Sequence, residues 1–382
     1  MRVSASQIYW RKGEPLFMNS DTTVLYLSHV QWNWIKQRPQ YLAAELAKHF
    51  EQLIYYQPQV YRDKGLKPNA DDGVEIQELS RIPSLRDRIK PFKAFNDWTA
   101  RKTIAKKLED CESPLVWLAS PATLAWVPDA YSGPLVYDCM DDHGAFASGP
   151  AMEEIDALER RLVERADLVL ASSTRLVGKM RQMAGTGEKK ILLVRNGFDG
   201  KILDCDGNNE CDCHGSSSFK ACYFGTIGPW FDFDLLRISL ECIPGLCYKI
   251  IGPVDDGVAP LQDPRIEYTG PVAHDSLGDY VVDCDCFVMP FKVNDIVLSV
   301  DPVKMYEYIN FGKDIVCVRY PEVERFNDYA ELYDGASGFC EALGTVMKRG
   351  SRKYSGRQRL SLLEESSWSS RVAPILEALG EL

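Results

Sequence analysis

Short apolar runs alternate with longer helical patterns through the first half of the chain. Each run has the length and composition of a strand buried on both faces, and a polar loop follows it. The runs are Val24–His29, Leu53–Tyr56, Val74–Leu79, Leu115–Ala119, Leu135–Asp138, Leu168–Ser172 and Ile191–Val194. Strands that alternate with helices predict an α/β fold with a parallel, doubly wound sheet.

The second half repeats the alternation. Its expected strands are Ala221–Gly225, Tyr248–Gly252, Ile266–Gly270, Cys286–Pro290 and Ile315–Val318. Four of the five end in glycine or proline, at the carboxyl ends where open α/β sheets bind ligands. Glycine there lets a phosphate or a ring approach the backbone, although a tight turn alone explains each glycine equally well. The recurrence favours a nucleotide-binding second half.

The two halves predict two domains with a cleft between them. The polar, Gly- and Ser-rich stretch Asp204–Ser218 lies at the junction, and a length of 382 residues allows two or three domains. We expect an N-terminal Rossmann-like domain over residues 21–198 and a C-terminal one over 199–365. A final helix over 366–382 is expected to return toward the first domain.

Composition narrows the class of protein. The net charge is −11 and 45% of residues are hydrophobic, which argues against general nucleic-acid binding and indicates a globular protein. No apolar window is long enough to span a membrane, and the first residues lack the apolar core of a secretory signal. These features predict a cytoplasmic protein.

One segment, residues 81–107, departs from the acidic average. It contains nine Lys and Arg residues against two acidic residues, a local charge of +7, with aromatic residues interspersed. Such a mixture favours the headgroup layer of an anionic membrane, which would make the protein peripheral at the inner membrane face; a solvated basic surface is the alternative. Pro83 and Pro91 predict a broken amphipathic segment.

Twelve cysteines are spread along the chain, without the arrangement of a small disulfide-bonded domain. A cluster of thiols and an imidazole could hold a structural metal, with a surface loop as the alternative. Its members are Cys205, Cys211, Cys213 and His214.

The stretch DPVKMYEYINFGKDIV, residues 301–316, predicts a short loop, a helix, a stop at Gly312 and a buried strand. Lys304 and Glu307 are three residues apart and therefore project from one side of the first helical turn. An ammonium suits a diphosphate and a carboxylate suits ribose hydroxyls, so this turn is a candidate nucleotide-sugar site. A solvated lysine in a surface ion pair is the alternative.

The order of several motifs resembles the GT-B glycosyltransferases, in particular family 4-type enzymes of bacterial polysaccharide synthesis. The motifs are WNWIKQRPQ at residues 32–40, NGFD, FGTIGPWFD, DCDCFVMPF and DPVKMYEYINFGKDIV. The resemblance implies a donor site in the second half, an acceptor site in the first and catalysis in the cleft, without a cofactor or a metal. Asp283-Cys284-Asp285 spells the DxD signature of the other major glycosyltransferase fold, but it precedes an apolar strand and is not expected to bind metal.

Donor contacts also follow from the resemblance. Lys304 matches a lysine that meets the diphosphate, and Glu307 matches the second glutamate of a Glu-x7-Glu pair, which holds the ribose. Ser299 stands where relatives have the first glutamate. The full set of expected donor-binding residues is Gly225, Gly252, Pro253, Ser299, Pro302, Val303, Lys304, Tyr306 and Glu307.

The loop after the strand Leu135–Asp138 contains the candidate general base. We expect Asp141 first, then Asp142, then His143, because a base at a strand end can deprotonate an acceptor hydroxyl. A helix cap or a turn explains the Asp pair as well. His29, Trp32 and Arg38 are expected on the acceptor or phosphate side, together with Trp34 and Gln37, although Trp34 is more typical of a core anchor.

The sequence thus predicts a metal-independent transferase that moves a hexose-type sugar from a nucleoside diphosphate to a hydroxyl of a glycan or lipid-linked glycan, with inversion favoured. A nucleotide-sugar epimerase of the same fold is one alternative. A non-catalytic nucleotide-sugar-binding partner in a polysaccharide-assembly complex is another, because Ser299 replaces a glutamate.

Overall fold

The computed structural model describes residues 22–33, 36–59, 73–82, 89–187, 189–198, 200–203, 218–349 and 351–382. The chain forms two compact units, one from Met1–Gly197 with Trp368–Leu382 and the other from Phe198–Ser367. The cluster Cys205, Cys211, Cys213 and His214 lies outside the described residues, and so does Trp34.

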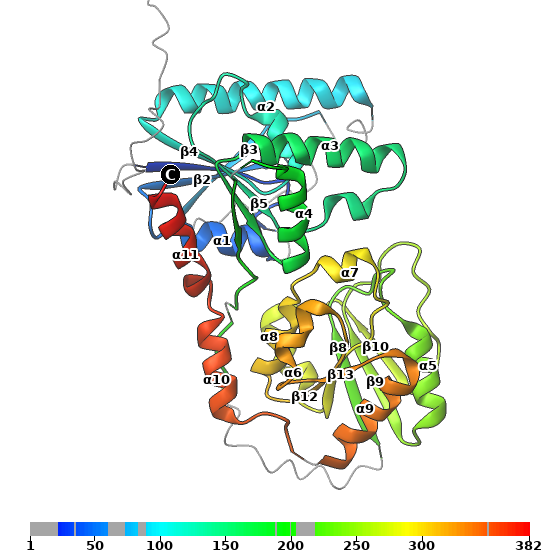
Figure 1. The fold of residues 1–382 in the computed structure, drawn as a ribbon. Helices are drawn as coiled ribbons and strands as arrows, with labels where there is room; N and C mark the ends of the chain where they lie inside the picture. Colours follow the sequence, from blue (N-terminus) through cyan, green and yellow to red (C-terminus); the bar gives the residue numbers. More distant parts are fainter. Residues whose placement is uncertain are drawn as a thin grey trace, which may run out of the picture. The chain divides into compact units, whose positions relative to one another are not determined.

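Unit 1 contains a seven-stranded parallel sheet in the order β3-β2-β1-β4-β5-β6-β7 (Figure 1). The strands are β1 (Thr22–Leu27), β2 (Gln52–Pro58), β3 (Val74–Leu79), β4 (Ser113–Leu118), β5 (Leu135–Cys139), β6 (Leu168–Ala171) and β7 (Lys190–Leu193). The order reverses between β1 and β4, and this switch point is where open α/β sheets bind ligands. The expected doubly wound sheet is confirmed.

Helices cover both faces of this sheet because alternate strand residues point in opposite directions. On one face, Leu25 of β1 packs in a core with Ile104 of α2 and Leu162 of α3; on the other, Tyr26 packs with Leu42 of α1 and Ile375 of α11 (Figure 1). The helices are α1 (Arg38–Leu46), α2 (Lys90–Asp110), α3 (Pro150–Arg165), α4 (Thr174–Ala184) and α11 (Trp368–Gly380), with short 3-10 helices η2 (Pro121–Trp126) and η3 (His143–Phe146).

Pro91 does not break the basic segment, contrary to the expectation from sequence. It lies in the first turn of α2, where its missing N–H would have had no helical partner, and the helix then runs unbroken for 21 residues. Pro83 lies outside the described residues. No helix within the described ranges is both long and apolar enough to cross a bilayer.

Unit 2 contains a six-stranded sheet in the order β10-β9-β8-β11-β12-β13, with a second switch point between β8 and β11. The strands are β8 (Phe219–Phe224), β9 (Leu246–Ile251), β10 (Ile266–Gly270), β11 (Cys286–Met289), β12 (Asp314–Val318) and β13 (Glu331–Tyr333). Strand β13 was not predicted, because three residues are too few to show a pattern and only their pairing with β12 defines them.

The helices of unit 2 are α5 (Phe233–Cys242), α6 (Leu277–Val281), α7 (Asp295–Ser299), α8 (Val303–Asn310), α9 (Gly335–Arg349) and α10 (Gly356–Glu365), with 3-10 helices η5 (His274–Ser276) and η6 (Pro321–Phe326). Helix α5 packs against α9, and α8 packs against α10, on opposite faces of the sheet (Figure 1). The predicted helix with its stop is confirmed as α8, which ends before the left-handed Gly312.

Candidate functional site

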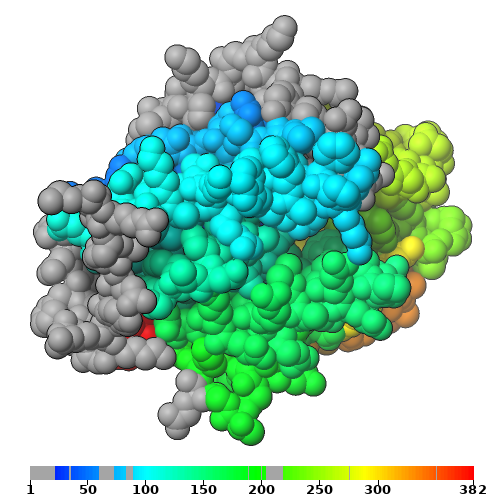
Figure 2. Space-filling view, turned by 90° about the horizontal axis from the view of Figure 1, so that it is seen from above, coloured from blue at the N-terminus to red at the C-terminus, as the bar shows by residue number. Residues whose placement is uncertain are grey.

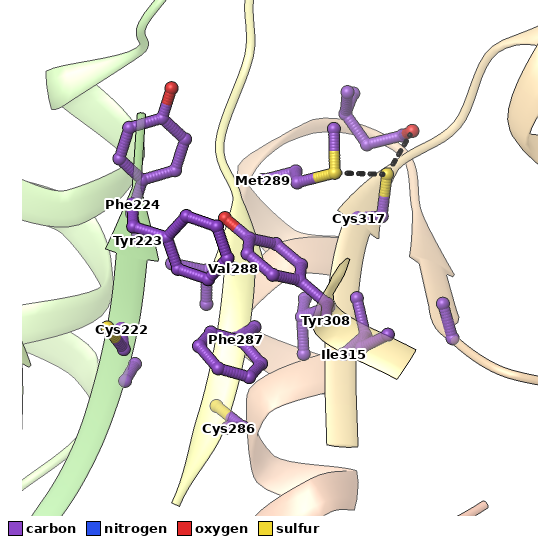
Figure 3. Close-up of a cluster of buried hydrophobic side chains, with 14 of the residues drawn as sticks. Cys222, Tyr223, Phe224, Cys286, Phe287, Val288, Met289, Tyr308, Ile315 and Cys317 are labelled. Atoms are coloured by element: carbon purple, nitrogen blue, oxygen red, sulfur yellow. Dashed lines mark hydrogen bonds between the residues drawn. The ribbon is translucent and has the colours of Figure 1, made fainter. Parts of the chain in front are cut away.

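Aromatic packing fixes α8 against the switch point of unit 2. The ring of Tyr308 stacks on Phe287 of β11 with a centroid distance of 4.3 Å and meets Phe224 of β8 edge-on at 4.8 Å (Figure 3). All three side chains are buried. Lys304 lies one helical turn before Tyr308, so this contact sets the height of Lys304 above the sheet.

Two glycines bring the backbone close to Lys304. Gly225 follows β8 with φ 133°, and a Cβ there would lie 2.2 Å from Cε of Lys304. Gly252 follows β9 with φ 143°, and a Cβ there would lie 2.1 Å from the carbonyl oxygen of Gly225. Hydrogen bonds from Gly225 N to Ile251 O and from Gly252 N to Gly270 O hold three adjacent loops together. These strand ends therefore require glycine, and they form the floor beneath the ammonium.

The ammonium of Lys304 has no anionic partner among the residues that the structure describes. Nζ lies 5.9 Å from the centroid of the Tyr223 ring. Desolvation lowers the pKa of Lys304, and the neighbouring Glu307 opposes that shift. A half-buried, unpaired cation at a topological switch point is suited to bind an anion.

Glu307 has a partner that the sequence did not reveal. Nε2 of His274, in the turn after β10, lies 2.7 Å from Oε1 of Glu307. The two residues are 33 positions apart, so only the tertiary fold brings them together. Within the described residues, Oε2 of Glu307 has no hydrogen-bond partner.

The other expected donor residues differ in their burial and in the hydrogen bonds that they make. Ser299 is buried in α7 and donates its hydroxyl to the carbonyl of Asp295 at 2.8 Å. Pro302 precedes α8, and Val303 is exposed in its first turn. Tyr306 is buried, and its hydroxyl accepts a hydrogen bond from Arg325 at 2.9 Å. The carbonyl of Pro253 accepts a hydrogen bond from Ile227 N, which pins the loop after β9.

The second candidate centre is the loop after β5 in unit 1. The carboxylate of Asp141 makes no hydrogen bond or ion pair with any residue in the described part of the chain. Desolvation is the main cause that raises its pKa to about 6; Asp138 and Asp142 add to the shift, and Arg38 opposes it. An unpaired carboxylate with a pKa near neutrality is suited to accept a proton.

Its neighbour Asp142 is engaged in a salt-bridge network instead. Nζ of Lys179 in α4 lies 2.7 Å from Asp142 and 2.9 Å from Glu159, a buried residue of α3. Glu159 also accepts a hydrogen bond from the hydroxyl of Tyr137. Because Lys179 joins the loop to two helices, Asp142 holds the loop in place and leaves Asp141 as the available base.

His143 and His29 place two imidazoles at the same edge of the sheet. Their ring centroids are 6.3 Å apart, and Nε2 of His143 is buried without a hydrogen-bond partner among described residues. The pKa of each is lowered to about 4, first by desolvation, then by Lys179 for His143 and by His143 for His29. Both imidazoles are therefore neutral at pH 7.

Arg38 makes a buried ion pair, which corrects the phosphate contact expected from the sequence. The residue is 5% exposed; Nε and NH2 donate to Asp138 of β5 at 2.8–3.0 Å, and NH1 donates to the carbonyl of Val194. These bonds join α1 to the ends of two strands. We therefore assign Arg38 to positioning β5, directly before the candidate base.

Trp32 likewise packs in the core and does not offer an exposed ring on which a sugar could stack. Its ring packs edge-on against Tyr55 at 5.1 Å, and its backbone N–H donates to Gln57 at 2.7 Å. Gln37 precedes α1, where its backbone N–H donates to the side chain of Gln40. No group of three or more His, Cys, Asp or Glu side chains suited to a metal occurs in the described residues.

Two Rossmann-like units with parallel sheets define the GT-B fold, and comparison with solved structures confirms it. Sucrose-phosphate synthase from Thermosynechococcus elongatus matches with a TM-score of 0.72 at 12% identity, over 94% of this chain and 98% of that one. HepE from Anabaena, solved in complex with UDP-glucose, matches with a TM-score of 0.66 at 15% identity, over 94% of this chain and all of that one.

Among individual proteins, the chain is similar to TuaH of Bacillus subtilis (strain 168), which is named as a teichuronic acid biosynthesis glycosyltransferase. The two are 22% identical over 265 aligned positions, and the alignment covers 64% of this chain and 66% of TuaH. The match thus spans just under two thirds of the length of TuaH. No family model matches the chain.

Proposed function

We propose that this chain is a glycosyltransferase that takes a sugar from a nucleoside-diphosphate donor. The observation that carries the proposal is the half-buried ammonium of Lys304, which has no anionic partner in the described part of the chain and lies above Gly225 and Gly252 at the switch point of a GT-B unit. The comparisons support it, because TuaH is named a glycosyltransferase and HepE was solved with UDP-glucose. TuaH is named for teichuronic acid biosynthesis, which supports a role in cell-surface polysaccharide synthesis.

The donor binds unit 2 through its charged and hydroxyl groups. Lys304 neutralises the diphosphate and stabilises the charge that develops on the leaving nucleotide, so the mechanism proposed here uses a side-chain cation and no metal. Gly225 and Gly252 let the phosphates approach the backbone. Glu307 accepts hydrogen bonds from the ribose hydroxyls.

The acceptor hydroxyl is deprotonated in unit 1 by Asp141. Its pKa of about 6 makes the carboxylate the main form at pH 7 while keeping it more basic than an ordinary aspartate. The neutral imidazole of His143 follows two residues later in the same loop, with the ring of His29 6.3 Å from it. Direct attack by the activated hydroxyl displaces the nucleoside diphosphate with inversion at the sugar carbon.

Incubation with a panel of nucleotide sugars, with and without glycan and lipid-linked glycan acceptors, tests the proposal. Nucleotide release that requires an acceptor, with the sugar recovered on that acceptor, is the expected result. Conversion of the donor to its epimer without an acceptor would identify an epimerase. Binding of nucleotide sugars without turnover across the panel would indicate a non-catalytic partner.

We also propose that α2 docks unit 1 on an anionic membrane at its inner face, where a lipid-linked acceptor would lie. Two aromatic side chains on this helix are exposed, Phe95 at 47% and Trp98 at 50%, and Nζ of Lys102 lies 4.0 Å from the centroid of the Trp98 ring. Figure 2 shows the face that carries α2, in cyan, beside α3, in green. Lysines with exposed aromatic rings match the headgroup layer.

A groove beside α2 adds to this surface. Its volume is about 440 Å³, and its lining includes Lys102, Lys106 and Lys107 together with Glu75 and Asp110. Three ammonium groups against two carboxylates give this groove a net positive charge, which attracts anionic headgroups.

Flotation with vesicles of neutral or anionic lipid measures the docking. Wild type should float with anionic vesicles, and a Phe95→Ala, Trp98→Ala double variant should bind at least about tenfold more weakly, since two large apolar side chains are lost. Tyr280→Ala, an exposed aromatic residue of unit 2, is the matched control and should float like wild type. Equal binding of wild type to neutral and anionic vesicles would contradict the docking proposal.

A further inference from the structure

The hydrogen bond between His274 and Glu307 lies at the edge of the proposed donor site. Lys304 and Glu307 share one turn of α8, so the diphosphate and ribose positions are adjacent. His274 belongs to a different segment, the 3-10 turn that follows β10. The turn and the helix therefore meet at the carboxylate, with Nε2 of His274 2.7 Å from Oε1 of Glu307.

We propose that His274 is a positioning residue that orients the carboxylate of Glu307 for the ribose diol of the donor. This inference rests on the proposed function, in which Glu307 holds the ribose. A carboxylate can only accept hydrogen bonds, so the Nε2 of His274 donates to it. The bond occupies one lone pair of Oε1 and leaves Oε2 for the ribose.

The benefit of this arrangement is pre-organisation. A glutamate on a helix surface samples several rotamers, and each ligand-binding event must select one of them. A hydrogen bond from a second segment selects that rotamer before the nucleotide arrives, which is how supporting contacts make binding residues effective. His274 is 63% exposed on its side chain and Glu307 is 21% exposed, so an ion pair here contributes little to folding.

A positioning role of His274 predicts a loss of affinity for one kind of nucleotide only. Removing the imidazole should weaken the binding of a ribonucleotide while leaving a nucleotide that lacks the 2′-hydroxyl almost unaffected. If His274 had only a structural role, its removal would weaken the binding of both nucleotides equally. The distinguishing quantity is therefore the ratio of the two dissociation constants, and not either constant alone.

The experiment measures binding of UDP and 2′-deoxy-UDP by calorimetry to the full chain, with GDP and ADP and their 2′-deoxy forms run in parallel. Wild type should prefer the ribonucleotide, and His274→Ala should lose affinity for it by roughly tenfold, together with the preference. His274→Gln should retain the preference, because its amide nitrogen can donate to the same carboxylate oxygen. Val282→Ala, an exposed position that directly follows α6, is the control and should behave as wild type.

The outcomes separate this inference from the proposed function. If wild type prefers ribonucleotides and His274→Ala keeps the same preference, the positioning role is wrong while the donor site stands. If wild type binds none of the six nucleotides, the donor site itself is wrong and the inference is overturned with it. Because His274 is exposed, circular dichroism should show all three variants folded as wild type.

Discussion

Replacing Lys304 by methionine should weaken donor binding without lowering the stability of the fold. The methionine side chain keeps most of the apolar stem and can still lie against Gly225, while it removes the charge. In the described structure this ammonium has no anionic partner, and desolvation lowers its pKa. The ligand-free protein therefore bears a desolvation cost that the variant does not.

The magnitudes follow from this geometry. A unit charge about 4 Å from an ammonium at an effective dielectric of about 20 interacts by about 4 kcal/mol, part of which is offset by desolvation of the phosphate. A net loss of about 2–3 kcal/mol is expected, which weakens donor binding by roughly 30- to 150-fold. The free energy of unfolding should stay the same or rise by up to about 1 kcal/mol.

The pH dependence gives a second signature. Because the folded-state pKa of Lys304 is lowered, the unfolded chain binds this proton more tightly than the folded chain. Wild-type stability should therefore rise as the pH increases toward the usual lysine pKa of about 10.4. In Lys304→Met, the part of this pH-dependent rise in stability that comes from Lys304 should be absent.

Calorimetry with UDP and urea unfolding at several pH values measure these effects. Lys348→Met, on the exposed side of α9, is the matched control and should leave UDP binding unchanged. A Lys304→Met protein that binds UDP as tightly as wild type would refute the assignment of this ammonium to the diphosphate. A large loss of stability would show that the lysine is a structural residue.

Two further substitutions test unit 1. Asp141→Asn should lower the transfer rate by about 10²- to 10⁴-fold and leave the donor affinity unchanged. It should also abolish the fall in rate below about pH 6, where the wild-type base becomes protonated. Full activity of this variant would exclude Asp141 as the base. The raised pKa also means that the ionised carboxylate costs stability above about pH 6, so Asp141→Asn should be about 1–2 kcal/mol more stable than wild type at pH 8 and equally stable at pH 4 in urea unfolding. Lys179→Met leaves Glu159 buried without its counter-ion and should lower the free energy of unfolding by about 3–5 kcal/mol. Lys179→Arg keeps the charge and should recover most of the lost stability. Equal stability of Lys179→Met and wild type would contradict the structural role of this salt-bridge network.

The sequence alone determined the fold class and the turn that carries Lys304 and Glu307. Apolar runs of strand length, separated by helical patterns, leave few architectures other than two parallel sheets, because such strands must be buried on both faces. A spacing of three residues on a helix also places two side chains on one side wherever the helix lies. These properties are local, so they could be predicted without tertiary information.

Only the tertiary structure decided which candidate residues are available for chemistry. Asp141 and Asp142 are adjacent in sequence, yet Lys179 of α4 pairs with Asp142, while Asp141 has no such partner among the residues that the structure describes. The sequence around Arg38 suggests a phosphate ligand, whereas in the fold Arg38 pairs with Asp138, 100 residues away. Burial and pairing depend on contacts between distant segments, and no local pattern encodes them. For the same physical reason, the contact of His274 with Glu307 became visible only in the folded chain.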